Sequence, residues 1–232
     1  MALPTIQAPQ DFKGRLKISA DTFVVVELNE MIQQEYPKMV REILGDAAYA
    51  EIRDAVTLPD KWADTMNGAA WLDSRGLLNI SQGLTQICKQ WLYFYWMRES
   101  PIINTNTGNV SNFNENSRAT SRGDVAAISC DRYNEGVDLL QDELYPFLLY
   151  FESVSRDVSA AANLGGNTWQ LTLPDTLYLA DGDAIKVDGV EYVAANVSAT
   201  TVEIESTASA FSVAVWYPFE NLPFPRKERV FA

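Results

Sequence analysis

Hydrophobic positions recur every three or four residues through the first two-thirds of the chain, which is the spacing of one face of an α-helix. This pattern occupies residues 28–44, 49–56, 82–97 and 125–151. Pro37 and Pro146 are expected to kink or break the first and last of these helices, and Gly45 suits the left-handed residue that ends a helix. We therefore expect a compact bundle of about four helices over residues 1–153.

Beyond residue 153 the period changes to two, which is the alternation of a half-buried β-strand. Alternating runs on either side of Asp188-Gly189 predict a hairpin with a tight turn. About five short strands are expected between Thr168 and Trp216, so residues 154–217 are predicted to form a small antiparallel β barrel or sandwich. Residues 218–232 contain three prolines and are predicted to be an extended C-terminal arm. The predicted fold class is α+β.

The composition narrows the range of functions. The chain has 18 Lys and Arg against 31 Asp and Glu, a net charge of −13, which argues against wrapping duplex DNA. It contains no histidine, which excludes His-dependent catalytic triads and His-ligated zinc or haem. Cys88 and Cys130 form no CxxC motif and are expected to be buried thiols. No apolar run approaches the ~18 residues of a membrane span, so no membrane association is expected.

Acidic residues gather in two places, and neither predicts a reactive site. Asp181, Asp183 and Asp188 lack the spacing of a calcium loop and are explained by turn chemistry. Asp142 and Glu143 are consecutive on a helix, so their carboxylates diverge. The sequence also lacks a phosphate-binding glycine loop and the GxSxG and SxxK motifs. We predict no catalytic residue, no metal site and no cofactor.

The aromatic run at residues 91–97 points to packing. On a helix its side chains face all round the axis, which is typical of a helix buried in a core or a subunit interface.

Two polar or basic segments are candidate protein interfaces. Residues 104–122 form a long, Asn-rich connection between two helices, which is either a disordered linker or a functional loop. We expect this loop to order on assembly against a neighbouring protein, and we expect the arm to dock on a partner through apolar anchors and basic side chains. The candidate interface residues are Thr105, Asn106, Thr107, Phe113, Asn114 and Asn116 in the loop, and Phe219, Leu222, Phe224, Arg226, Lys227 and Arg229 in the arm.

An ordered set of short motifs resembles one protein family. The set consists of Ile43-Leu44-Gly45-Asp46 with Tyr49, Trp62, Met66-Asn67-Gly68, Gly83-Leu84, Thr105-Asn106-Thr107-Gly108, Asn114-Glu115-Asn116-Ser117 and Tyr133-Asn134-Glu135-Gly136-Val137. Over residues 20–152 the chain resembles the head–tail connector (neck adaptor) proteins of tailed bacteriophages, in particular those of Bacteroidetes phages, including crAss-like phages. The resemblance does not cover residues 154–217.

The resemblance implies a structural virion protein without enzymatic activity. Such proteins form a ring, typically of twelve copies, that binds the portal protein and other neck or tail proteins and joins the head to the tail. DNA passes through the channel without sequence-specific binding, and an acidic chain suits the passage of a polyanion. The implied location is the neck of the virion, after synthesis in the host cytoplasm.

Two other classes of function remain open. A carbohydrate-binding or adhesin-like module would use the β-rich region, with Trp169, Tyr178, Tyr192 and Trp216 as a stacking platform. An enzyme would need a pair of carboxylates in a pocket.

Overall fold

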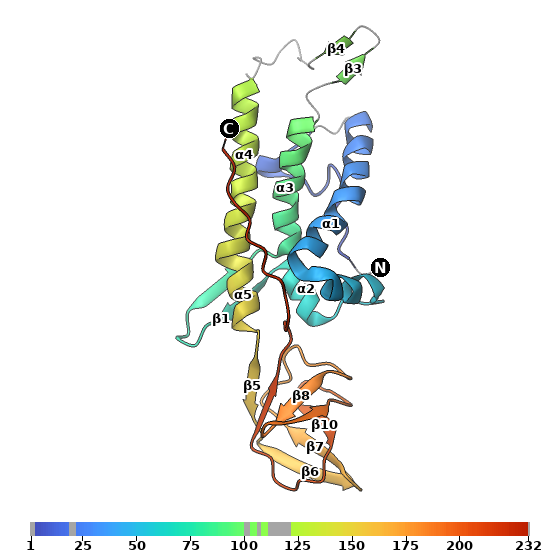
Figure 1. Ribbon diagram of the computed structural model, residues 1–232, viewed down its shortest axis with the longest axis vertical. Helices are drawn as coiled ribbons and strands as arrows, with labels where there is room; N and C mark the ends of the chain where they lie inside the picture. The colour runs from blue at the N-terminus through green and yellow to red at the C-terminus, as the bar shows by residue number, and fades with distance from the viewer. Residues whose placement is uncertain (1–2, 19–21, 100–102, 106–107, 111–121, 232) are drawn as a thin grey trace. The chain divides into compact units, whose positions relative to one another are not determined.

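The computed structural model describes residues 3–18, 22–99, 103–105, 108–110 and 122–231 (Figure 1). It confirms the α+β class, with helices in the N-terminal region and antiparallel sheets after them. The chain divides into two compact units. Unit 1 comprises Met1–Leu58, Trp62–Pro146 and Leu222–Ala232, and unit 2 comprises Pro59–Lys61 and Phe147–Asn221.

The first long helix of unit 1, α1 (Thr22–Asp54), follows a short 3-10 turn at Gly14–Leu16 and changes direction at Gly45. Gly45 has φ 83° and ψ 171°, a conformation with positive φ that glycine alone adopts readily, and a second helical stretch follows directly. The helix does not break at Pro37, since helical backbone continues through it. Burial of the neighbouring Tyr36 and Val40 offsets the hydrogen bond that the proline removes.

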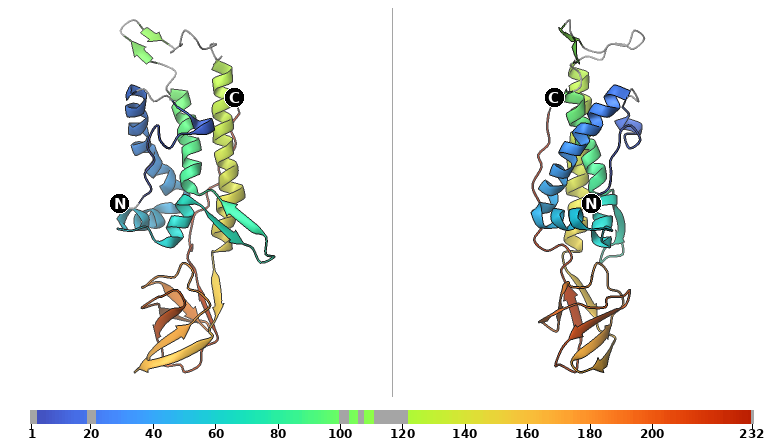
Figure 2. Two further views of the ribbon diagram at one scale, coloured as in Figure 1. Left: turned by 180° about the vertical axis from the view of Figure 1, so that it is seen from behind. Right: turned by 90° about the vertical axis from the view of Figure 1, so that its right-hand side faces the viewer.

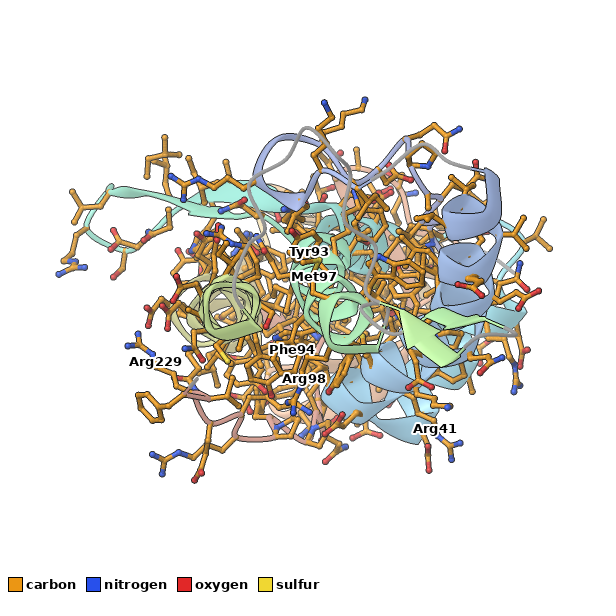
Figure 3. The ribbon with its side chains drawn as sticks, turned by 90° about the horizontal axis from the view of Figure 1, so that it is seen from above. Arg41, Tyr93, Phe94, Met97, Arg98 and Arg229 are labelled. Atoms are coloured by element: carbon orange, nitrogen blue, oxygen red, sulfur yellow. The ribbon has the colours of Figure 1, made fainter. Side chains whose placement is uncertain are left out.

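Helix α3 (Leu84–Glu99) is the centre of unit 1 and packs against α1 and α4 (Arg122–Leu139). Its aromatic run is a packing element, as predicted: five of the seven side chains are buried, and Tyr95 is exposed. Phe94 and Arg98 share one side of the helix, with the guanidinium 5.2 Å from the ring centre (Figure 3). Cys88 is buried in this core, and burial raises the pKa of its thiol.

Helix α4 approaches α3 closely at Gly136. A Cβ at this position would lie 2.6 Å from Nε1 of Trp91, whose N–H donates to the Tyr133 carbonyl at 3.2 Å. After α4 the chain makes one π-helical turn, Leu140–Leu144, and continues as α5 (Tyr145–Tyr150). The expected disturbance at Pro146 therefore takes the form of a wider turn just before it, in which the Tyr145 N–H donates to the Leu140 carbonyl.

Unit 1 also holds two hairpins that the hydrophobic pattern did not predict. Strands β1 (Ala69–Leu72) and β2 (Leu78–Ser81) lie between α2 (Asp60–Asn67) and α3, and β3 (Ile103–Thr105) pairs with β4 (Gly108–Val110). Strands of three or four residues are too short for alternation to be recognised against the helical pattern around them.

Unit 2 contains two antiparallel sheets. The strand orders are β10-β7-β6 and β5-β11-β8-β9. The strands are β5 (Val154–Asp157), β6 (Ala160–Gly165), β7 (Thr168–Thr172), β8 (Ala184–Val187), β9 (Val190–Val193), β10 (Thr201–Glu205) and β11 (Val213–Trp216). Strands β5 and β6 were not predicted. Strand β6 is composed mostly of small residues and is exposed along its whole length, so it shows no alternation of buried and exposed positions.

The predicted hairpin at Asp188-Gly189 is confirmed. Val187 pairs with Val190, and the two turn residues have φ of 50° and 84°, as a type I′ turn requires. The Asp188 carboxylate accepts hydrogen bonds from the backbone N–H groups of Ser212 and Val213 at 2.9 and 3.0 Å. Asp181 and Asp183 likewise accept backbone N–H groups, which supports turn chemistry over a calcium site.

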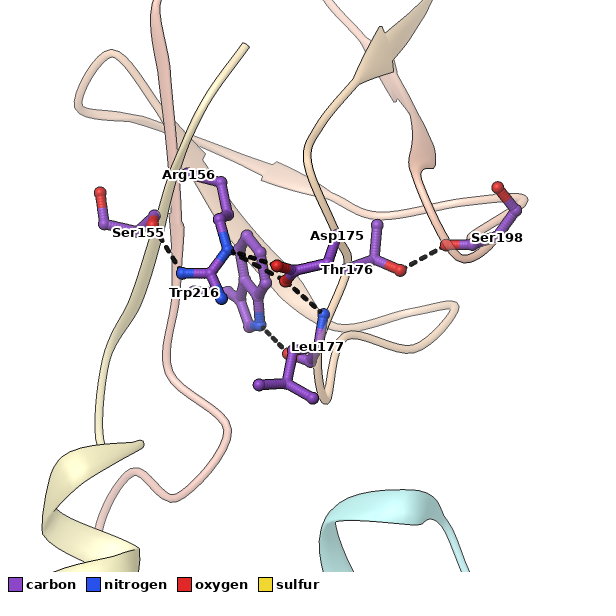
Figure 4. Close-up of polar contacts among 7 residues, drawn as sticks. All are labelled: Ser155, Arg156, Asp175, Thr176, Leu177, Ser198 and Trp216. Carbon is purple, nitrogen blue, oxygen red and sulfur yellow. Dashed lines mark hydrogen bonds and ion pairs between the residues drawn. The ribbon is translucent and has the colours of Figure 1, made fainter. Parts of the chain in front are cut away.

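A polar cluster fastens the loop after β7 to β5 and β11 (Figure 4). Nε of Arg156 lies 3.0 and 2.9 Å from the two carboxylate oxygens of Asp175, and the Trp216 indole donates to the Leu177 carbonyl at 2.8 Å. The Thr176 hydroxyl donates to the Ser198 carbonyl. The inward residues of β11 are Ala214 and Trp216, whereas Val213 and Val215 are half-buried.

Candidate assembly surface

The β1–β2 hairpin projects from the helices of unit 1 (Figure 2, left), and its exposed side chains form an apolar outer face. In its register Ala70 pairs with Ile80 and Leu72 pairs with Leu78, so these four side chains share one face. Leu72, Leu78 and Ile80 are 60%, 64% and 59% exposed. The opposite face carries the buried Trp71 and Ser81. We call the four outer residues and the exposed Leu77 at the tip the hairpin surface.

The tip of the hairpin is fixed by Asp73. Its Oδ1 accepts the N–H groups of Arg75 and Leu77, both at 2.9 Å, and its Oδ2 lies 2.9 Å from the Arg75 guanidinium. The hydrogen bond from Leu77, followed by that from Arg75, holds the pKa of the Asp73 carboxyl below its usual range. Gly76 supplies the positive φ that the turn needs.

Two glycines lock the base of the hairpin. A Cβ on Gly68 would lie 2.4 Å from the carbonyl oxygen of Ser81, and a Cβ on Gly83 would lie 2.3 Å from the Gly68 nitrogen. Both glycines have positive φ, 94° and 80°. Only glycine therefore permits the two chain segments to approach this closely.

The π-helical turn also contacts the base. The carboxylate of Glu143 accepts the Gln82 backbone N–H at 2.9 Å and its side-chain amide at 3.3 Å. An open groove of about 480 Å³ lies beside this contact, lined by residues that include Asn67, Ile80 and Gln86. The hairpin is therefore a stiff projection with a fixed orientation on unit 1.

The chemistry of the hairpin surface is that of a protein interface. Its two-stranded sheet leaves an outer edge on each strand, and its apolar face is contiguous rather than scattered. In the part of the chain that the structure describes, no three metal-ligating side chains lie together. Among the described residues, no helix has the length and hydrophobicity required to cross a bilayer.

The expected interface residues of the arm occupy different places. Phe219 is 1% exposed and packs on Phe147 and Tyr178 within unit 2, so it is a core residue rather than an accessible anchor. Phe224 packs edge-on against Tyr145 in unit 1. Leu222 is half-buried, and Arg226 is exposed. Lys227 and Arg229 pair with Glu42 and Asp138 of the same chain.

The expected interface residues of the polar loop are mostly undescribed. The backbone of Thr105 belongs to β3 and pairs with Gly108. Asn106, Thr107, Phe113, Asn114 and Asn116 lie outside the described residues. The expected role of this loop in contacting a neighbouring protein therefore stays a prediction.

The four aromatic residues of the possible carbohydrate platform do not form one open face. Trp216 is a core residue, 1% exposed, and Tyr178 packs edge-on against Phe151. The hydroxyl groups of Tyr192 and Ser206 are hydrogen-bonded at 2.9 Å, and Trp169 packs on Phe211.

Sequence reasoning missed the hairpin surface, although a signal for it exists. The segment from Trp71 to Ile80 places apolar pairs on both sides of Asp73-Ser74-Arg75-Gly76, a turn-forming sequence.

No known protein family matches the chain, and neither a curated protein nor a solved structure is significantly similar to it.

Proposed function

We propose that this chain is a structural subunit of a phage neck, in which copies form a ring that joins the portal to the tail. The hairpin surface carries the proposal. An exposed apolar face on a hairpin that is held at its base and its tip is suited to burial against another protein. A ring needs such a face on one side of each subunit, because a head-to-tail interface that closes on itself uses two different surfaces.

Two further observations support this role. The net charge of −13 lets a channel built from this chain repel DNA rather than retain it, which suits genome ejection. The motifs that resemble neck adaptor proteins also coincide with structural positions. Gly68 and Gly83 lock the hairpin, Gly45 redirects α1, and Gly136 admits Trp91.

The proposal is tested by the assembly state of the purified full chain. The wild-type protein should form rings, measured by light scattering after size exclusion and seen by negative-stain microscopy. The double substitution Leu72→Ser and Ile80→Ser should raise the midpoint concentration of assembly at least tenfold, because it removes apolar area that is buried on assembly.

The matched control is Leu164→Ser on β6 of unit 2, which alters a side chain of similar exposure, 54%. The control should assemble as the wild type does, and all three proteins should have the same helical circular dichroism. Assembly of the double variant at wild-type concentrations would overturn the role of the hairpin surface. The place in the neck is tested separately, by gold-labelled antibody on virions, and label away from the head–tail junction would contradict it.

A further inference from the structure

The C-terminal tail of unit 1, which the structure describes over residues 222–231, runs in an extended conformation beside α4 and the start of α5 (Figures 1 and 2). Pro225 lies near Tyr145 and Val230 near Asn134, so the tail is antiparallel to these helices. The helix side chains that hold it are Asn134, Asp138, Gln141 and Tyr145. Their spacing of four, three and four residues places them on one helix face.

Three of these side chains bind the backbone of the tail. The Tyr145 hydroxyl donates to the Pro225 carbonyl at 2.5 Å, and the Gln141 amide donates to the Lys227 carbonyl at 2.8 Å. Asn134 donates to the Val230 carbonyl at 2.9 Å and accepts the Val230 N–H at 2.8 Å. This is how a groove holds an extended peptide, through its main-chain groups.

The side chains of the tail add selectivity. Nζ of Lys227 lies 2.5 Å from Oε1 of Glu42 and 5.4 Å from the centre of the Trp91 ring. Arg229 lies beside α4 (Figure 3), 2.6 Å from Asp138. The groove therefore recognises two basic residues separated by one position. We call Glu42, Trp91, Asn134, Asp138, Gln141 and Tyr145 the tail groove.

The backbone is left-handed at two residues near the start of the tail. Asn221 and Phe224 have φ of 64° and 43°, and this left-handed region disfavours a bulky side chain such as that of Phe224. The tail forms no helix or strand of its own, and its contacts with the groove are made through side chains of the helices. An equivalent tail from another molecule could make every one of these contacts without any change in the groove.

We infer that the tail groove is a receptor for the C-terminal tail of a second copy of this chain, so that neighbouring subunits exchange tails on assembly. The inference deepens the proposed function and rests on it, since exchange requires copies that lie next to one another. A second copy is the occupant because each chain carries one groove and one matching tail. A groove and a matching tail are two different surfaces of one chain, and a head-to-tail interface that closes into a ring uses two such surfaces.

Charge reversal can separate exchange between chains from binding within one chain. The groove-reversed chain carries Glu42→Lys and Asp138→Lys, and the tail-reversed chain carries Lys227→Glu and Arg229→Glu. Within either chain the groove and tail then repel each other. When the two chains are mixed, the tail of each matches the groove of the other. A chain with all four substitutions restores both pairs and serves as the control for folding.

Each reversed chain alone should assemble at about tenfold higher concentration than the wild type, because two partly exposed ion pairs are replaced by repulsions. An equimolar mixture should return to the wild-type midpoint, measured by mass photometry, and native mass spectrometry should show alternating chains. The four-fold variant should also assemble as the wild type does.

If the mixture assembles no better than either reversed chain alone, tail exchange is wrong. If the wild-type chain still forms rings in that case, the proposed function remains supported. Reversed chains that each assemble at the wild-type midpoint would also overturn it. If the wild type stays monomeric while the two reversed chains form a heterodimer, exchange holds and the proposed ring is wrong.

Discussion

The β1–β2 hairpin and the C-terminal tail are both extended segments attached to the helices of unit 1, and they differ in what their side chains contact. The tail meets polar and charged partners on its own helices: Pro225, Lys227, Arg229 and Val230 all have hydrogen bonds or ion pairs there. The outer residues of the hairpin, which include Leu72 and Ile80, are apolar and exposed.

This difference shows why segment composition alone is a poor guide to an interface. A proline-rich, basic tail is suited to docking, yet in this structure its own chain supplies the complementary surface. An apolar face cannot be stabilised by water in the same way, so its exposure is the stronger sign that another molecule covers it. Polar contacts such as those of the tail exchange readily with contacts to water, whereas an exposed apolar face is stabilised only by burial.

The largest effect should come from breaking the base of the hairpin. Gly68→Ala places a Cβ 2.4 Å from a backbone oxygen in a left-handed conformation, so the free energy of unfolding of unit 1 should fall by about 3 kcal/mol or more. The change in the free energy of unfolding is measured by urea denaturation, followed by the helical circular dichroism signal.

Gly76→Ala is the matched control for that substitution. Its φ of 77° is also left-handed, but nothing lies within 4 Å of the added Cβ, so it should cost only about 1 kcal/mol. Equal losses in the two variants would show that the close approach at the base does not hold the hairpin.

A smaller effect should come from loosening the tail. Asn134→Ala removes both hydrogen bonds to Val230, which should weaken tail docking by about 1–2 kcal/mol. Hydrogen exchange of the Val230 amide should accelerate by about tenfold, while amides in the hairpin keep their rates. The control is Asp131→Ala, at an exposed position on the same helix, and it should leave the Val230 amide unchanged. Unchanged protection in Asn134→Ala would mean that other contacts fix the tail.

The smallest effect should come from protonating Asp73 at low pH. Because the folded-state pKa of Asp73 is depressed, the stabilisation that its carboxylate gives the hairpin tip is present above the ordinary pKa of 3.8. It is lost as the pH falls through the lower folded value. The amide shift of Leu77, followed by NMR, should therefore titrate with a midpoint below 3.8. Asp73→Asn should abolish this transition, and a midpoint at or above 3.8 would contradict the role of Asp73.

Much of the fold could be predicted where one signal dominated. The helical spacing of the buried residues of α3 and the Asp188-Gly189 turn act over a few neighbouring residues, and both predictions are confirmed. The places where prediction failed involve competition between effects. Pro37 opposes a helix that burial sustains, and the small residues of β6 carry no alternation to detect.

The candidate site was harder to predict, for a geometric reason. Trp71 and Leu72 are adjacent apolar residues that point to opposite faces of β1, and the sequence alone cannot decide which of them the helices cover. The turn at Asp73 and Gly76 was visible in the sequence, but the burial of Trp71 and the exposure of Leu72 depend on tertiary contacts of the hairpin, such as the one with the π-helical turn.

Four features could be read from the amino-acid sequence: the class of fold, the helical and β-rich regions, the turn at Asp188-Gly189 and the packing role of the aromatic helix. Each depends on periodicity or on the backbone preferences of single residues. The exposed apolar face of the hairpin and the docking position of the basic tail became known from the packing of the folded chain. Both depend on residues far apart in the chain, such as Gln82 with Glu143 and Lys227 with Glu42, and local pattern carries no information about such pairs.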